Sequence, residues 1–141
     1  MTANPSFLPV KSGVYLAPDD TSALRAATEA ERFSWYELNL GRVGNKREFL
    51  AACAKGLRFP RSFGGNWDAL ADCLKDLAAD FVVSLRNCEP FAEGAADDYA
   101  MALEVFQDAA DFWRERGSLF IVLVDVEPEG VKMRRFALSK K

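Results

Sequence analysis

The residues most able to do chemistry lie in one stretch, FPRSFGGNWDALADCLKDLAAD, from Phe59 to Asp80. It predicts a loop, a sharp turn at Gly64-Gly65 and a helix capped by Asn66. The Asn66 side chain can accept a hydrogen bond from the free amides of the first helical turn. Glycines in such a turn leave room for the backbone or bases of another molecule to come close. Ser62 and Phe63, which precede the turn, are candidate contact residues for the same reason.

The predicted helix has a row of carboxylates on one face, because Asp68, Asp72 and Asp76 occur every four residues. Like charges at this spacing oppose the helix by about 0.2–0.5 kcal/mol per pair. The helix dipole favours Asp68 in the first turn, but it does not favour Asp72 or Asp76. These two residues suggest a function outside the helix, although a solvated outer face is the alternative. The inward face is predicted to hold Trp67, Leu70, Ala71, Leu74, Leu77 and Ala78.

Two other chemistries are weakly supported. Asp68 and Asp72 could form an acid–base pair, but exposed carboxylates one turn apart would both stay ionised. The Gly64-Gly65-Asn66 turn could hold a phosphate, since helix N-termini favour anions. A phosphate about 6 Å from the Asp68 carboxylate would be repelled by roughly 3 kcal/mol per unit charge at an effective dielectric constant of 20. The Lys-Ser/Thr pair of a P-loop is also missing.

A second acidic row lies on a helix expected from about Asp97 to Arg116. Its members are Glu104, Asp108, Asp111 and Glu115. Around the axis of an α-helix, these four positions fall within about sixty degrees of one another. The opposite side would pack inward through Leu103, Phe106, Ala110 and Trp113. A solvated face explains this row by itself, so it becomes informative only beside the first row.

Composition argues against an enzyme. The 141-residue chain has no histidine, the side chain on which most acid–base catalysis, nucleophilic triads and zinc sites rely. Its three scattered cysteines favour reduced thiols in a cytosol over a disulfide framework or a metal site. The N-terminus has no secretory signal pattern, and no apolar run is long enough to span a membrane. We therefore expect a cytoplasmic protein without metal or cofactor.

Charge distribution indicates the kind of partner. The net charge is −3, and the last ten residues carry +5 from Lys132, Arg134, Arg135, Lys140 and Lys141, so residues 1–131 carry −8. An acidic body disfavours nucleic acid as a direct partner and suits a basic protein.

The order of predicted elements indicates an α/β fold. Strands are expected at 13–18, 33–40, 81–85 and 119–126, and helices at 21–32, 46–55, 67–80 and 97–116, with a loop at 86–95. The helix at 46–55 would be capped by Asn45 and bury Phe49, Leu50 and Cys53. Alternating strands and helices predict a parallel sheet. The segment from Met133 to Lys141 is either frayed or an added edge strand, and the position of the first strand is open.

The central stretch resembles the barstar-related family of intracellular ribonuclease inhibitors. The matching residues, which follow the family's loop and second helix in order and without gaps, are Pro60, Phe63, Gly64, Asn66, Asp68, Ala69, Leu70, Asp72, Cys73 and Leu74. A looser similarity extends from about Phe33 to Asp125.

The resemblance implies a small parallel sheet of three to four strands packed with helices, with an extra N-terminal βα unit. We predict a single domain, with a core at about 33–126, an N-terminal extension at 1–32 and a basic tail at 127–141. In the family, this loop and helix fill the cationic active site of a ribonuclease. Asp68 and Asp72 match its acidic anchors, and Asp108 matches a further acidic contact. Another acidic position falls near Phe112, where only Asp111 or Glu115 is available.

Departures from the family pattern leave two hypotheses. Ser62, Ala71 and Leu77 stand where barstar presents aromatic residues, which anchor many interfaces. The first hypothesis is a non-enzymatic inhibitor, monomeric before binding, that occludes the active site of a basic ribonuclease or nuclease toxin. The second is a regulatory or assembly module that binds another basic protein and inhibits no nuclease.

Overall fold

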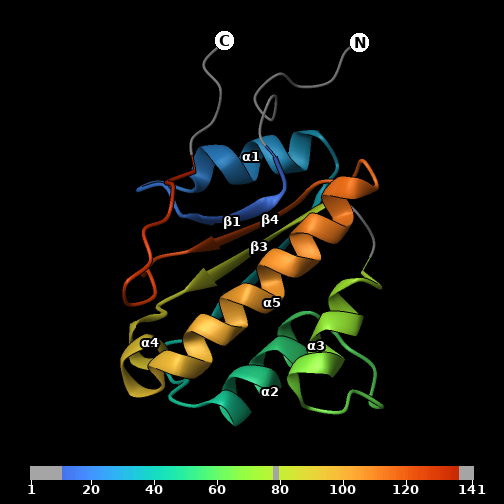
Figure 1. The fold of residues 1–141 in the computed structure, drawn as a ribbon. Coiled ribbons are helices and arrows are strands. Elements are labelled where there is room, and N and C mark those ends of the chain that lie inside the picture. The colour runs from blue at the N-terminus through green and yellow to red at the C-terminus, as the bar shows by residue number, and fades with distance from the viewer. Residues whose placement is uncertain (1–10, 78–79, 137–141) are drawn as a thin grey trace.

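The structure is a computed structural model that describes residues 11–77 and 80–136. Its centre is a sheet of four parallel strands in the order β1-β4-β3-β2 (Figure 1). The strands are β1 (Gly13–Leu16), β2 (Ser34–Asn39), β3 (Phe81–Arg86) and β4 (Phe120–Val124). The predicted α/β class and parallel sheet are confirmed, and the open question of the first strand is answered: β1 pairs with β4, Gly13 opposite Ile121.

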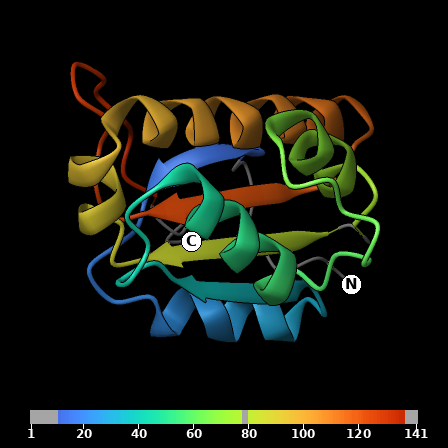
Figure 2. The ribbon, with the colours of Figure 1, turned by 90° about the horizontal axis from the view of Figure 1, so that it is seen from below.

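Helices cover both faces of this sheet. Those of the described residues are α1 (Ser22–Ala30), α2 (Lys46–Gly56), α3 (Trp67–Leu74), α4 (Glu89–Gly94) and α5 (Ala96–Glu115). Helices α2 to α5 share one core with the sheet, and α1 packs into a second core on the other face. Figure 2 shows α5 and α1 on opposite sides of the sheet. None of the described helices is both long and apolar enough to cross a membrane.

The two central strands are almost wholly apolar because each face of the sheet is buried. Along β4, Phe120, Val122 and Val124 enter the larger core, whereas Ile121 and Leu123 enter the smaller one. Aromatic rings pack against one another in the larger core. The Phe49 ring of α2 lies 4.9 Å from that of Phe91, and the core extends outward to Trp67 on α3. The predicted inward residues Phe49, Leu50 and Cys53 are all buried.

Two predicted elements differ from the structure. The segment 86–95, expected as a loop, contains α4, which begins after Cys88. The carboxylate of Asp125 accepts hydrogen bonds from the amides of Asn87 and Cys88 at 2.7 and 3.0 Å, so a residue distant in sequence holds this helix start. The helix expected to continue to residue 80 ends at Leu74. The predicted inward residue Ala78 lies outside the described residues.

A C-terminal strap, residues 127–136, closes the free edge of β1. The amide of Leu16 donates to the carbonyl of Arg134 at 2.9 Å, and the amide of Phe136 donates to the carbonyl of Leu16 at 2.8 Å. The Phe136 side chain is 2% exposed and meets the Tyr15 ring edge-on at 5.4 Å. The sequence left open whether the segment 133–141 is frayed or forms an added edge strand. Residues 133–136 lie along the sheet edge, and residues 137–141 lie outside the described part.

We predict that Phe136→Ala lowers the free energy of unfolding by about 3 kcal/mol, because it empties a buried aromatic site and loosens the strap. Chemical denaturation monitored by circular dichroism measures this change. Val131→Ala, on an exposed part of the same strap, is the matched control and should change the free energy by less than about 0.5 kcal/mol. Equal effects of the two variants would contradict the role given to Phe136.

Candidate protein-binding site

The turn before α3 has the geometry that its sequence predicts. The Asn66 side chain accepts a hydrogen bond from the amide of Ala69 at 2.7 Å, so the predicted cap is formed. Gly65 has a φ angle of +70°, in the left-handed region that other residues avoid, and a Cβ built there would meet nothing within 4 Å. Gly64 and Gly65 are both exposed. The turn therefore presents bare backbone to a neighbouring molecule.

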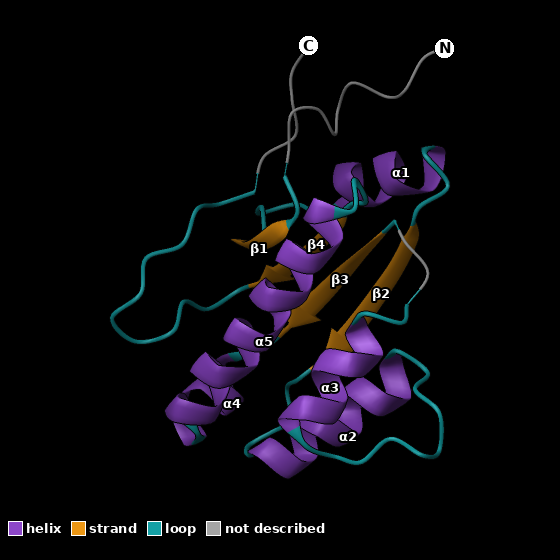
Figure 3. Ribbon diagram, turned by 45° about the vertical axis from the view of Figure 1, so that its right-hand side comes forward, coloured by secondary structure: helices purple, strands orange, loops and turns teal. Residues whose placement is uncertain are grey.

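The loop that leads into this turn is held by its own aromatic residues. The rings of Phe59 and Phe63 lie 5.1 Å apart, and both pack against the larger core. The amide of Phe63 donates to the carbonyl of Pro60 at 2.9 Å. Phe63 is half-buried, whereas Ser62 is exposed. Figure 3 shows the loop running beside α2 and α3.

Helix α3 turns two carboxylates to solvent. Leu70 and Leu74 are fully buried on its inner side, which forces Asp68 and Asp72 outward. Within the described residues, neither carboxylate forms an ion pair or a side-chain hydrogen bond. Both charges thus lack a partner among residues 11–77 and 80–136.

Helix α5 fixes the position of α3. The indole N–H of Trp113 donates to the carbonyl of Leu74 at 3.1 Å and so satisfies an acceptor at the last residue of α3. Close by, the Lys75 ammonium lies 5.4 Å from the centre of the Phe112 ring. These contacts hold the C-terminal end of α3 against the C-terminal half of α5.

Asp108 lies on the side of α5 that borders α3, because it shares a helical row with Phe112. It is exposed and has no ion pair within the described residues. We call Asp68, Asp72 and Asp108 the acidic face.

Asp111 and Asp76 lie elsewhere. The Asp111 carboxylate pairs with Arg114 at 3.2 Å and accepts a hydrogen bond from the Gln107 side chain at 2.9 Å. The same Gln107 side chain accepts a hydrogen bond from the amide of Val14 on β1. Asp111 is therefore already paired along its own helix. Asp76 is exposed, but it follows the end of α3, where its amide donates to the carbonyl of Cys73 at 3.1 Å. The predicted continuous row of three helical aspartates is reduced to two.

A basic hollow, which the sequence reasoning missed, adjoins the glycine turn before α3. It is lined by Lys46, Arg47, Leu50, Ala51, Phe63 and Gly65. The Lys46 ammonium lies 5.3 Å from the ring centre of Trp67, the first residue of α3. The signal was present in the sequence, since two cations directly follow the Asn45 cap, where a helix disfavours positive charge.

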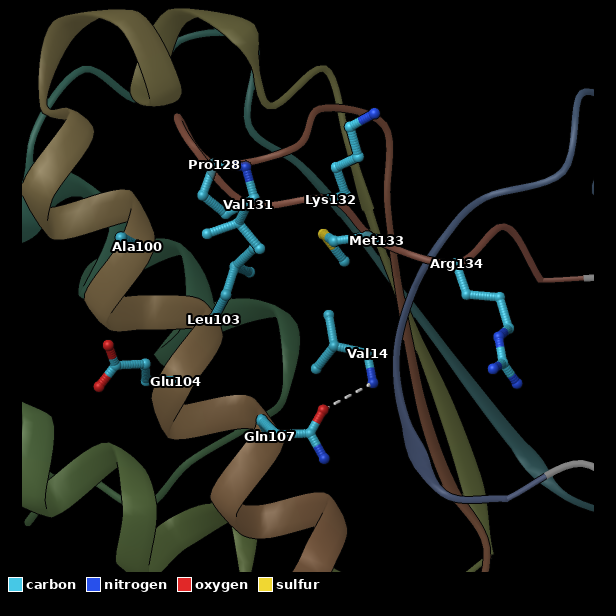
Figure 4. Close-up of a pocket in the computed structure, with 10 residues that line it drawn as sticks. All are labelled: Val14, Ala100, Leu103, Glu104, Gln107, Pro128, Val131, Lys132, Met133 and Arg134. Carbon is cyan, nitrogen blue, oxygen red and sulfur yellow. Dashed lines mark hydrogen bonds between the residues drawn. The ribbon is translucent and has the colours of Figure 1, made fainter.

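A second groove lies on the opposite flank of α5, between this helix, β1 and the strap (Figure 4). Leu103, Val131 and Met133 converge in it, whereas the charged ends of Glu104, Lys132 and Arg134 point away. The Gln107 side chain accepts a hydrogen bond from the amide of Val14 at 3.3 Å and so caps part of the strand edge. No residue of the acidic face lines this groove.

The cysteine thiols are not poised for nucleophilic chemistry. Burial raises the pKa of Cys53, and it raises that of Cys88 to about 12. The pKa of Cys73, on α3, is raised by partial burial and further by the charges of Asp76 and Asp72. All three are free, and no group of acidic or thiol side chains within the described residues has the arrangement of a metal site. The candidate site therefore offers charge and shape rather than a reactive group.

The family model described as Barstar (barnase inhibitor) matches residues 33–125. The chain belongs to the barstar family. The match begins just before β2 and ends just after β4, so it includes the glycine turn, α3 and Asp108. Strand β1, helix α1 and the strap lie outside the part that matches barstar. No curated protein matches the chain.

We predict that Gly65→Ala lowers the free energy of unfolding by about 1 kcal/mol, because alanine is strained at a φ angle of +70°. Denaturant titration measures the loss. Gly64→Ala is the matched control, because its Cβ would meet only ordinary contacts at 3.6 Å from Ala69 and Asn66. It should stay within about 0.5 kcal/mol of the parent. A neutral Gly65→Ala variant would show that the turn is not strained.

Proposed function

We propose that this barstar-family protein is a cytoplasmic inhibitor of a basic ribonuclease or a related nuclease toxin. The acidic face and the Gly64-Gly65 turn enter the cationic substrate groove of the enzyme and occupy positions that RNA phosphates would take. Inhibition is by occlusion and requires no chemistry on the inhibitor. The inhibitor is a monomer before it binds.

The observation that carries the proposal is the state of Asp68 and Asp72. Both are exposed, and no basic side chain of the described chain pairs with either. Leaving like charges one turn apart on a helix costs stability, and no ion pair within the described residues offsets that cost. A cationic groove offsets it, because opposite charges attract strongly once water is excluded between them. The family description, barnase inhibitor, supports the same class of partner.

We rank the proposed contact residues by their expected contribution to binding. Asp72 and Asp68 lead, Asp108 supports them from α5, and the turn contributes through Ser62, Phe63, Gly64, Gly65 and Asn66. Asp76 and Asp111 are peripheral, since Asp76 follows the helix and Asp111 is paired with Arg114. The positions where barstar has aromatic residues remain small or aliphatic, so charge carries more of the binding energy here.

One observation favours a second candidate function. The missing aromatic residues at Ser62, Ala71 and Leu77 weaken the apolar part of the interface, as expected for an assembly module that binds a basic protein other than a nuclease. Purified basic ribonucleases, barnase included, separate the two candidates in an RNA-cleavage assay. Inhibition of at least one at stoichiometric concentration supports the inhibitor. Inhibition of none, together with a pull-down that retains a basic protein without RNase activity, supports the module.

We predict that Asp72→Ala raises the inhibition constant by about 30-fold or more. Truncating one partner of a buried interfacial charge pair costs about 2–5 kcal/mol in general, and barnase and barstar are themselves a reference system for this effect. Steady-state RNA cleavage at varied inhibitor concentration measures the constant. The free energy of unfolding should stay within about 1 kcal/mol, because the side chain is exposed.

Glu129→Ala is the control for this variant, since it removes one exposed charge from the strap on the other flank of α5. It should leave the inhibition constant within about twofold of the parent. If Asp72→Ala inhibits as well as the parent, Asp72 does not belong to the interface.

We also predict that the association rate with the ribonuclease falls about tenfold or more from low salt to 1 M salt, because screening shortens the reach of the acidic face. Stopped-flow fluorescence measures the rate. The combined variant Asp68→Ala/Asp72→Ala should show a flatter salt dependence. A rate independent of salt in the parent would mean that short-range contacts, not charge, control encounter.

A further inference from the structure

The basic hollow lies beside the glycine turn, and its charge is opposite to that of the acidic face. Lys46 and Arg47 stand at its rim, and Leu50, Ala51 and Phe63 supply apolar surface. The Lys46 ammonium lies 5.3 Å from the ring centre of Trp67, and Gly65 of the glycine turn lines the hollow. A molecule that covers the glycine turn and α3 therefore also meets these two cations.

Local physics does not explain the two cations. Lys46 and Arg47 occupy the first turn of α2, where the helix dipole disfavours positive charge. Glu48, the acid of that turn, is engaged by the amide of Gly44, which donates to its carboxylate at 2.8 Å. Within the described part of the chain, neither Lys46 nor Arg47 forms an ion pair. Within the same residues, Lys46 has the Trp67 ring as its partner, whereas no contact is found for the Arg47 guanidinium, whose charge runs against helix stability.

We propose that the basic hollow receives an acidic side chain of the ribonuclease, most simply a glutamate beside the enzyme's cationic groove. The apolar surface suits the methylene groups of that side chain, and the two cations suit its carboxylate. Gly65 also lines the hollow, and its amide donates no hydrogen bond within the described residues. This inference rests on the proposed function and specifies the partner: its surface carries negative charge next to positive charge.

The change in affinity when the two cations are removed distinguishes this proposal from an effect of the overall electrostatic field. The proposed ribonuclease is basic, so removing two positive charges from its inhibitor should strengthen binding if only the overall field matters. If the two cations contact a carboxylate, removing them weakens binding.

The experiment uses whichever purified basic ribonuclease, barnase included, the parent chain inhibits most strongly. The variant Lys46→Gln/Arg47→Gln should raise the dissociation constant at least tenfold in isothermal titration calorimetry. Its melting temperature should stay within a few degrees of the parent, because loss of the Lys46–Trp67 contact opposes the gain from removing two charges unfavourable to α2. A double-mutant cycle against Glu→Gln changes at the groove rim of the ribonuclease should find one glutamate whose effect disappears in the variant.

Lys55→Gln, in the last turn of the same helix and outside the hollow, is the matched control and should change the dissociation constant by less than twofold. If the double variant binds as well as or better than the parent, the hollow takes no carboxylate, and the proposed function still stands. If the parent chain inhibits none of the ribonucleases, the proposed function fails, and this inference fails with it.

Discussion

Burial of both faces of the sheet is the constraint on which the rest of the structure depends. Because β3 and β4 have no solvent-facing side, every helix must cover them with an apolar side and offer a polar one to water. For α3, Leu70 and Leu74 take the inner side, and Asp68 and Asp72 are left outside. The direction of the carboxylates thus follows from packing, and the hydrogen bond from Trp113 to Leu74 fixes where that helix ends.

Charge in this protein is arranged at some cost to the fold. Repeated aspartates on α3 repel one another, and the two cations that open α2 oppose its dipole. A protein selected for stability alone has no reason to keep either arrangement. Both arrangements lie on helices that flank the glycine turn, and they support the proposal of one interface that carries both signs of charge.

The parts outside the family match complete the sheet rather than the acidic face. Strand β1 extends the sheet beyond β4, α1 covers the second face, and the strap supplies hydrogen bonds to the outer edge of β1. An uncovered parallel edge strand would offer free amides and carbonyls to other chains. Here Gln107 and Arg134 contact the two outward-facing amides of β1, at Val14 and Leu16.

The sequence by itself determined the α/β class, the parallel sheet, both asparagine caps and the exposed aspartates Asp68 and Asp72. These features follow from local patterns: apolar periodicity, capping residues and charge spacing within one helix. Tertiary structure decided the rest. The end of α3 depends on Trp113, and the start of α4 depends on Asp125. Each of these outcomes is set by a partner more than ten residues away in the chain, and no local pattern contains that information.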